Sequence, residues 1–111
     1  MKLRNLLIAG LGLAMAAGAA GAASAATTPW QAHHPRRVEV NHRIAHLNRS
    51  IRVERRDGEL TAARARRLHE RAHLVRVQER HDARTHGGHI TRREQVRLNR
   101  EETGVRRHIP A

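Results

Sequence analysis

The sequence predicts an all-α fold, a small array of three helices joined by two tight loops. Two observations predict it. Apolar residues recur at steps of three and four in three segments, which is the spacing of one helical face. Between these segments lie two short sequences of the form Gly-x-[Leu/Ile]-Thr, a pattern that ends one helix and begins the next. We therefore expect helices over about 36–56, 62–84 and 92–107, with no competing strand pattern.

The apolar stripes of the three expected helices differ in strength. The stripe of the first helix is Val40, Ile44, Leu47 and Ile51, and that of the second is Ala65, Leu68, Ala72 and Val75. Because Leu74 and Val77 lie on another side of the second helix, we expect this helix to sit between the other two. The third stripe is thinner, with Leu98, Val105 and Ile109, and Pro110 marks its end.

The two loops belong to an internal repeat of thirty residues, in which Asp57-Gly58-Glu59-Leu60-Thr61 matches Gly87-Gly88-His89-Ile90-Thr91. We expect Gly58 and Gly88 to end helices, and the Leu or Ile that follows to turn inward. Thr61 and Thr91 are the expected N-caps. Thr91 and Glu94 form a T-x-x-E capping box, whereas Arg64 replaces the Glu in the first copy, so the first cap is predicted to be weaker.

Residues 1–25 are typical of a cleavable signal peptide. Lys2 and Arg4 give a positive start, an apolar stretch follows, and Ala23-Ser24-Ala25 supplies the small residues of a cleavage site. We therefore expect the remaining chain to be periplasmic or secreted. We predict that residues 26–35 are a disordered lead-in and that residues 36–109 form an Arg-rich helical domain. No second apolar run follows, so we expect no transmembrane segment after signal removal.

The mature chain has little material for a large core. Its 86 residues contain no cysteine, so no disulfide compensates for an apolar content that is aliphatic and sparse. We expect marginal stability, which assembly into a homo-oligomer would raise.

Positive charge is the strongest functional signal. The chain carries +12 at pH 7, and +10 remains once Lys2 and Arg4 are removed. Arginines recur at i,i+4 on the expected helices, where each like-charged pair costs roughly 0.2–0.5 kcal/mol and a polyanion would relieve the repulsion. These arginines are Arg52, Arg56, Arg67, Arg71, Arg76, Arg80, Arg84, Arg93 and Arg97.

This arginine pattern favours an anionic polymer, a lipid surface or an acidic protein as the partner. In a cell envelope the candidates are lipopolysaccharide phosphates, anionic lipid, extracellular DNA and acidic protein. Trp30 is the only aromatic residue and lies outside the expected helices, so no platform for base stacking exists. We therefore do not expect sequence-specific binding of nucleic acid.

Ten histidines suggest metal binding as an alternative. His42 and His46 lie four apart, as do His69 and His73, which places two imidazoles on one helical face as half of a zinc, copper or nickel site. The first pair lies opposite the apolar stripe and is expected to be exposed. No third ligand can be named, and neither loop has the oxygen ligands of a calcium-binding EF-hand.

The sequence shows no catalytic constellation. It has no Cys or Tyr, and Ser50, the only serine after the signal, has no motif around it. The carboxylates lie among arginines, which lower carboxylate pKa values and leave poor general acids. We interpret them as surface ion pairs: Glu54, Asp57, Glu70, Glu79 and Glu94. We predict no enzymatic activity and no cofactor.

Several motifs resemble those of a group of small uncharacterised exported proteins of proteobacteria. They are His34-Pro35-Arg36-Arg37, Val40-Asn41, the two loops, and Glu94-Gln95 with Leu98-Asn99. The likeness covers nearly the whole mature chain and implies an all-helical periplasmic or secreted protein without an assigned activity. A fainter resemblance, through Leu60-Thr61 and Ile90-Thr91, is to periplasmic chaperones of the Spy and CpxP type, which carry L-T-x-x-Q motifs.

The sequence therefore predicts an exported, non-enzymatic protein that acts by binding. Arginines on its helix faces would meet an anionic ligand. Metal binding through the two histidine pairs and a chaperone-like holdase activity are the alternatives.

Overall fold

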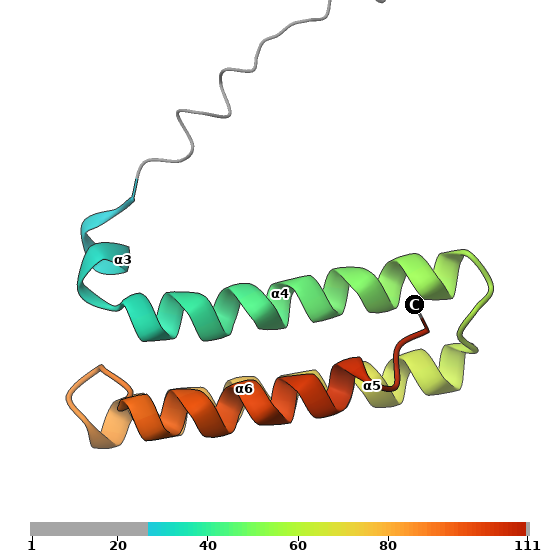
Figure 1. Cartoon of the computed structure of the whole chain (residues 1–111). Coiled ribbons are helices and arrows are strands. Elements are labelled where there is room, and N and C mark those ends of the chain that lie inside the picture. Colours follow the sequence, from blue (N-terminus) through green and yellow to red (C-terminus); the bar gives the residue numbers. More distant parts are fainter. Residues whose placement is uncertain (1–26, 111) are drawn as a thin grey trace, which may run out of the picture. The chain divides into compact units, whose positions relative to one another are not determined.

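The computed structural model describes residues 27–110, so the predicted signal peptide lies outside the described residues. The described chain forms four helices and no strand: α3 (Pro29–His33), α4 (Pro35–Arg56), α5 (Ala62–Thr85) and α6 (Arg92–Arg106) (Figure 1). The all-α prediction is confirmed, and the three long helices begin and end within one residue of their predicted bounds. None of the helices in this part of the chain is both long enough and apolar enough to span a bilayer.

The lead-in differs from the disorder predicted over 26–35, because it contains α3. This short helix lies in a separate unit of the chain that ends at His33. Thr28 Oγ1 accepts a hydrogen bond from the backbone N–H of Gln31 (3.1 Å), and Gln31 Oε1 accepts one from the N–H of Thr28 (2.8 Å). These two bonds form a capping box, and Pro29 at the first helical position has a backbone already suited to a helix. The sequence Thr-Pro-x-Gln was the signal for this helix.

Helices α4, α5 and α6 form a bundle in which every helix contacts the other two. The short loops make α5 antiparallel to both neighbours, so α4 and α6 run in the same direction (Figure 1). The expectation that α5 sits between the other two is therefore wrong. Leu74 and Val77, on which it rested, are 64% and 43% exposed. In a triangular bundle each helix buries a single stripe, because both of its neighbours lie on the same side.

The buried stripes are those that the spacing predicted on α4 and α5, and Leu98 and Val105 on α6. They form two clusters. The cluster toward the α5–α6 loop is Val40, Ile44, Val75, Ala83, Ile90 and Leu98. The cluster toward the α4–α5 loop is Leu47, Ile51, Leu60, Ala65, Leu68 and Val105. Ile109 lies beyond the end of α6 and packs, half-buried, against this second cluster.

Each loop contains a glycine in the left-handed region and ends at a threonine cap. Gly58 has a φ of 84° and Gly88 a φ of 96°, which residues with a Cβ rarely adopt. Thr61 Oγ1 accepts a hydrogen bond from the backbone N–H of Arg64 at 3.1 Å. Thr91 and Glu94 form both bonds of the capping box, at 3.1 and 2.8 Å. The start of α6 therefore has two side-chain bonds where the start of α5 has one.

Three carboxyl groups lie inside the bundle: Glu79, Asp82 and Glu102. The interpretation of Glu79 as a surface ion pair is therefore wrong. Glu79 is fully buried and accepts hydrogen bonds from the Arg37 guanidinium and from Asn41 of α4. The available signal was its position four residues after Val75, on the buried stripe of α5.

Glu39 of α4 is the main polar link to α6. It accepts hydrogen bonds from Gln95 Nε2 (2.9 Å) and Asn99 Nδ2 (3.1 Å) of α6, and from Arg43 Nε of its own helix (2.7 Å). Burial opposes the ionisation of Glu39, but these bonds and the charge of Arg43 outweigh it and lower its pKa below the usual value. Glu39 is therefore a charged acceptor that joins the two parallel helices.

Candidate anion-binding site

The last turns of α4 and the first half of α5 form a shallow, open groove of about 680 Å³, called here the α4–α5 groove. Its α4 residues are spaced by three and four, which places their side chains on one face of the helix. Ala62 and Ala65 contribute small side chains from α5, and Glu70 is the one carboxylate among the lining residues. The basic and imidazole side chains that line it are Arg52, Arg55, Arg56, Arg66, His69 and His73.

Three of the four guanidiniums in this groove have no anionic partner among the described residues. In residues 27–110 no carboxylate lies within 4.0 Å of Arg52, Arg55 or Arg66. Arg56 Nε is 3.4 Å from Asp57 Oδ1, but both side chains are exposed, and such pairs contribute little to stability. The groove therefore gathers more positive charge than Glu70 and Asp57 can neutralise. Guanidiniums that lack an anionic partner favour bidentate hydrogen bonds to phosphate or carboxylate.

His69 is the most constrained of the residues that line the groove. Its Nδ1 lies 2.7 Å from Asn48 Oδ1, and because that oxygen only accepts, Nδ1–H donates. Burial lowers the pKa of His69, and the charge of Arg52 lowers it further. His69 is therefore neutral at pH 7 and leaves Nε2 as an acceptor. The positive charge of the groove comes from its arginines.

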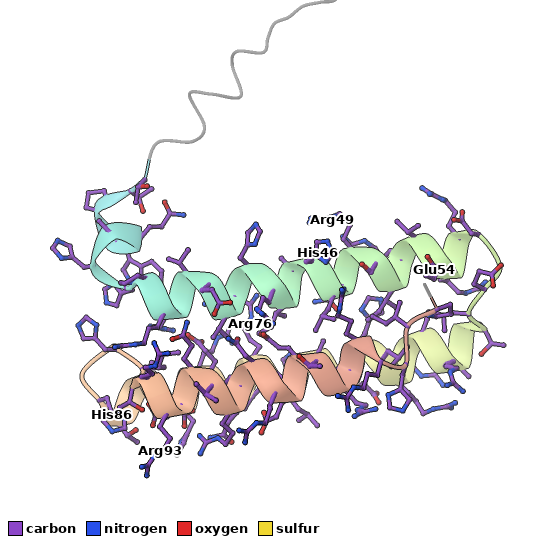
Figure 2. The ribbon with its side chains drawn as sticks, in the orientation of Figure 1. His46, Arg49, Glu54, Arg76, His86 and Arg93 are labelled. Atoms are coloured by element: carbon purple, nitrogen blue, oxygen red, sulfur yellow. The ribbon has the colours of Figure 1, made fainter. Side chains whose placement is uncertain are left out.

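A second hollow, of about 660 Å³, lies between α4 and the end of α6 and is called here the C-terminal pocket. Arg49 lines it from α4, Arg106 is the last residue of α6, and Arg107 follows directly. Within the described part of the chain, no carboxylate lies within 4.0 Å of these three guanidiniums. Glu54 also lines the pocket, and Figure 2 shows its place on α4 close to the C-terminal segment.

The structure brings together only part of the predicted arginine set. Arg52 and Arg56 line the α4–α5 groove, and the other seven line neither this groove nor the C-terminal pocket. Arg97 instead donates to the buried Asp82 at 3.0 Å. Arg76 is half-buried, and Figure 2 shows Arg93 at the opposite end of the bundle from Glu54. The remaining exposed arginines of the set are Arg67, Arg71, Arg80 and Arg84.

Five arginines of the two hollows were not predicted: Arg49, Arg55, Arg66, Arg106 and Arg107. The i,i+4 criterion compares residues of a single helix, whereas each hollow is formed between two helices. A local signal did exist, because arginines are dense on both sides of the α4–α5 loop.

The two predicted histidine pairs lie in different places. His42 and His46 are exposed, as predicted, and line a smaller hollow of about 370 Å³ between α4 and α6. His69 and His73 line the α4–α5 groove. Among residues 27–110, no group of three or more His, Cys, Asp or Glu is placed to hold a metal ion. Each pair therefore remains a half-site without a third described ligand.

Glu102 is a buried carboxyl group that the sequence analysis did not single out. It is 2% exposed, and neither of its oxygens has a hydrogen-bond partner in the described residues. Burial raises the pKa of Glu102 to about 8; the charge of Arg43 opposes this rise, and three neighbouring carboxylates reinforce it. Glu102 is therefore mostly protonated at pH 7. Its position between Leu98 and Val105, on the stripe of α6, was the available signal.

Comparisons with protein-family models, with curated proteins and with solved structures find no match to this chain. Its function is therefore inferred from its own two arginine-lined hollows. Both present guanidiniums that lack partners in the described chain, and such groups bind oxyanions strongly through charge-assisted hydrogen bonds.

Proposed function

We propose that the protein is exported and acts, without catalysis, by binding anionic ligands in the α4–α5 groove. The observation that carries this proposal is the set of three guanidiniums, those of Arg52, Arg55 and Arg66, with no described carboxylate within 4.0 Å. An oxyanion in the groove would reduce the repulsion among these charges and gain bidentate hydrogen bonds.

The spacing of the arginines favours a ligand with several negative groups. Arg52 and Arg56 are one helical turn apart, about 6 Å along the axis, and Arg66 faces them from α5. Phosphates of lipopolysaccharide, an anionic lipid surface, an acidic protein or extracellular DNA supply such groups. Binding to any of them releases counterions and is therefore weakened by salt.

The groove is tested by a variant of the full-length protein in which Arg52, Arg55 and Arg66 are all replaced by Gln. Binding to anionic vesicles, lipopolysaccharide and DNA is measured as a function of salt concentration. We expect the slope of log K against log salt to become shallower by about 2–3, because up to three fewer counterions are released. Unchanged binding at low salt in this variant would refute the proposed groove.

A matched control separates the groove from net charge. Replacing Arg67, Arg80 and Arg84 by Gln also removes three positive charges, but from exposed positions outside the groove. In the control we expect the slope of log K against log salt to become shallower by less than about 1. The reason is that charges are screened over roughly 10 Å at moderate salt. Equal losses in the two variants would mean that the protein binds anions by its overall charge.

The proposed site of action outside the cytosol rests on the signal-like sequence of residues 1–25. Fractionation of cells that express the protein tests it, together with sequencing of the mature N-terminus. We expect the protein in the periplasm or the medium, beginning at Ala26. Full-length protein retained in the cytosol would contradict export.

A further inference from the structure

Three guanidiniums line the C-terminal pocket, one from α4 and two from the end of α6. Arg49 comes from α4, Arg106 ends α6, and Arg107 lies in the following turn. A carboxylate has two oxygens, which a single arginine fork can satisfy. A phosphate group offers three strong acceptor oxygens and nearly two negative charges at pH 7, and so matches three guanidiniums better.

Glu54 gives the same pocket a negative group. Its side chain is half-buried, and no guanidinium or imidazole of the described residues lies within 4.0 Å of its carboxylate. A pocket for a simple anion would be weakened by this carboxylate, because like charges repel. A ligand that carries an ammonium group beside its phosphate would use it instead.

The size and remaining lining of the pocket fit a ligand larger than phosphate alone. Its volume of about 660 Å³ lies within the range of small-molecule sites. Val53, Ile109 and Pro110 contribute apolar surface to the lining. Ser50, which also lines the pocket, has a hydroxyl with no hydrogen bond in the described residues and can donate to a phosphate oxygen.

We propose that the C-terminal pocket binds a phosphorylated amino alcohol. Its phosphate would be held by Arg49, Arg106 and Arg107, and its ammonium group by Glu54. A free phosphate ester and the headgroup of a phospholipid both present this pair of charges. The pocket shares no lining residue with the α4–α5 groove, so the proposal does not depend on the function proposed for that groove.

Calorimetry with the full-length protein tests the required pair of charges. The probes are O-phosphoethanolamine, inorganic phosphate and ethanolamine. We expect O-phosphoethanolamine to bind at least about tenfold more tightly than either of the others, because only it fills both charge sites. Equal affinity for inorganic phosphate would show a simple anion site and would overturn the proposal.

Variants identify the residues. Glu54→Gln should weaken O-phosphoethanolamine binding and strengthen inorganic phosphate binding, two changes of opposite sign that a general loss of structure does not produce. Arg106→Gln should weaken both probes by about tenfold. Arg93→Gln removes one exposed arginine of α6 outside the pocket and serves as the control. Weakening in Arg93→Gln equal to that in Arg106→Gln, or tighter O-phosphoethanolamine binding in Glu54→Gln, would contradict the assignment.

A vesicle experiment distinguishes a phospholipid headgroup from a free phosphate ester as the source of the ligand. Vesicles of phosphatidylethanolamine present the headgroup, and vesicles of phosphatidylcholine present a bulkier ammonium that cannot donate a hydrogen bond. Arg106-dependent binding to the former alone identifies a lipid headgroup, whereas binding of only the soluble ester identifies a free metabolite. Failure of both the vesicles and the soluble ester to bind would reject the proposal, whatever the result for the α4–α5 groove.

Discussion

The two ends of the bundle differ in how their charges are paired. Toward the α5–α6 loop, carboxylates of one helix meet donors of another: Glu79 accepts from Arg37, and Glu39 accepts from Gln95 and Asn99. Toward the α4–α5 loop, the guanidiniums of the groove and of the C-terminal pocket mostly lack partners in the described chain. Ten acidic residues cannot pair with 22 basic ones, so the positions of the acids decide which arginines are left for a ligand.

The largest expected effect comes from breaking the buried pair at the α5–α6 loop end. Arg37→Ala leaves the Glu79 carboxylate buried without its guanidinium, which should lower the free energy of unfolding by about 3–5 kcal/mol. Arg56→Ala at the other end removes only an exposed contact with Asp57 and should cost less than about 1 kcal/mol. Urea denaturation measures both. Similar losses would mean that the two ends do not differ in this way.

Glu102→Gln tests a buried acid that lacks a hydrogen-bond partner. The pKa of Glu102 is about 8 in the folded state, above its ordinary value of 4.5, so folding favours the protonated form. Its contribution to stability is therefore full below pH 4.5, falls as the pH rises toward 8, and is lost above pH 8. Gln removes this dependence, so near pH 9 the variant should be more stable than the wild type by about 2–4 kcal/mol.

The measurement for Glu102 is the free energy of unfolding of both proteins across this pH range. Near pH 4 the two should differ by less than about 1 kcal/mol, because Gln has nearly the shape of the protonated acid. Stability profiles that run parallel at every pH would contradict a raised pKa for Glu102.

The two threonine caps allow the same substitution to be compared at both ends. Thr91→Ala removes a member of the complete capping box and should cost about 1–2 kcal/mol. Thr61→Ala removes a single bond, to the N–H of Arg64, and should cost about 0.5–1 kcal/mol. Thermal unfolding of the two variants measures the difference. A larger loss for Thr61→Ala would contradict the ranking.

The smallest expected effect is a gain. Arg64→Glu would complete the capping box at the start of α5 and place a negative charge in its first turn, where it is stabilised by the helix dipole. We expect the free energy of unfolding to rise by about 0.3–1 kcal/mol. The Tm of the variant against that of the wild type checks this, and a lower Tm would show that the substitution does not restore the cap.

Local rules predicted the long helices because their signals lie within a few residues of each other. The stripe from Val40 to Ile51, the positive φ of Gly58 and the cap at Thr91 each depend on neighbours in the chain. The same kind of rule would have found α3, since Thr28 and Gln31 are three residues apart.

Features that depend on the packing of helices were not predicted from spacing. The C-terminal pocket joins Arg49 to Arg106, residues on different helices whose proximity depends on how α4 and α6 lie against each other. For Glu79 and Glu102, residue type predicts the surface, whereas position on an apolar stripe predicts the core. In both cases the position decided the outcome. Residue type favours the surface for glutamate, but a helix cannot turn one side chain away from a face that its neighbours bury.

The hydrogen bonds of Glu39 affect the C-terminal pocket, which lies far from Glu39 along α4. Gln95 and Asn99, its donors on α6, are one turn apart, so both bonds form in only one longitudinal register of the two helices. A slip of α6 by one turn, about 5.4 Å, would leave at most one of the two donors within reach of Glu39 and would also move Arg106 away from Arg49. The hydrogen bonds of Glu39 thus set how Arg49 and Arg106 are aligned across the C-terminal pocket. Glu39 itself lies about 15 Å before Arg49 along the axis of α4.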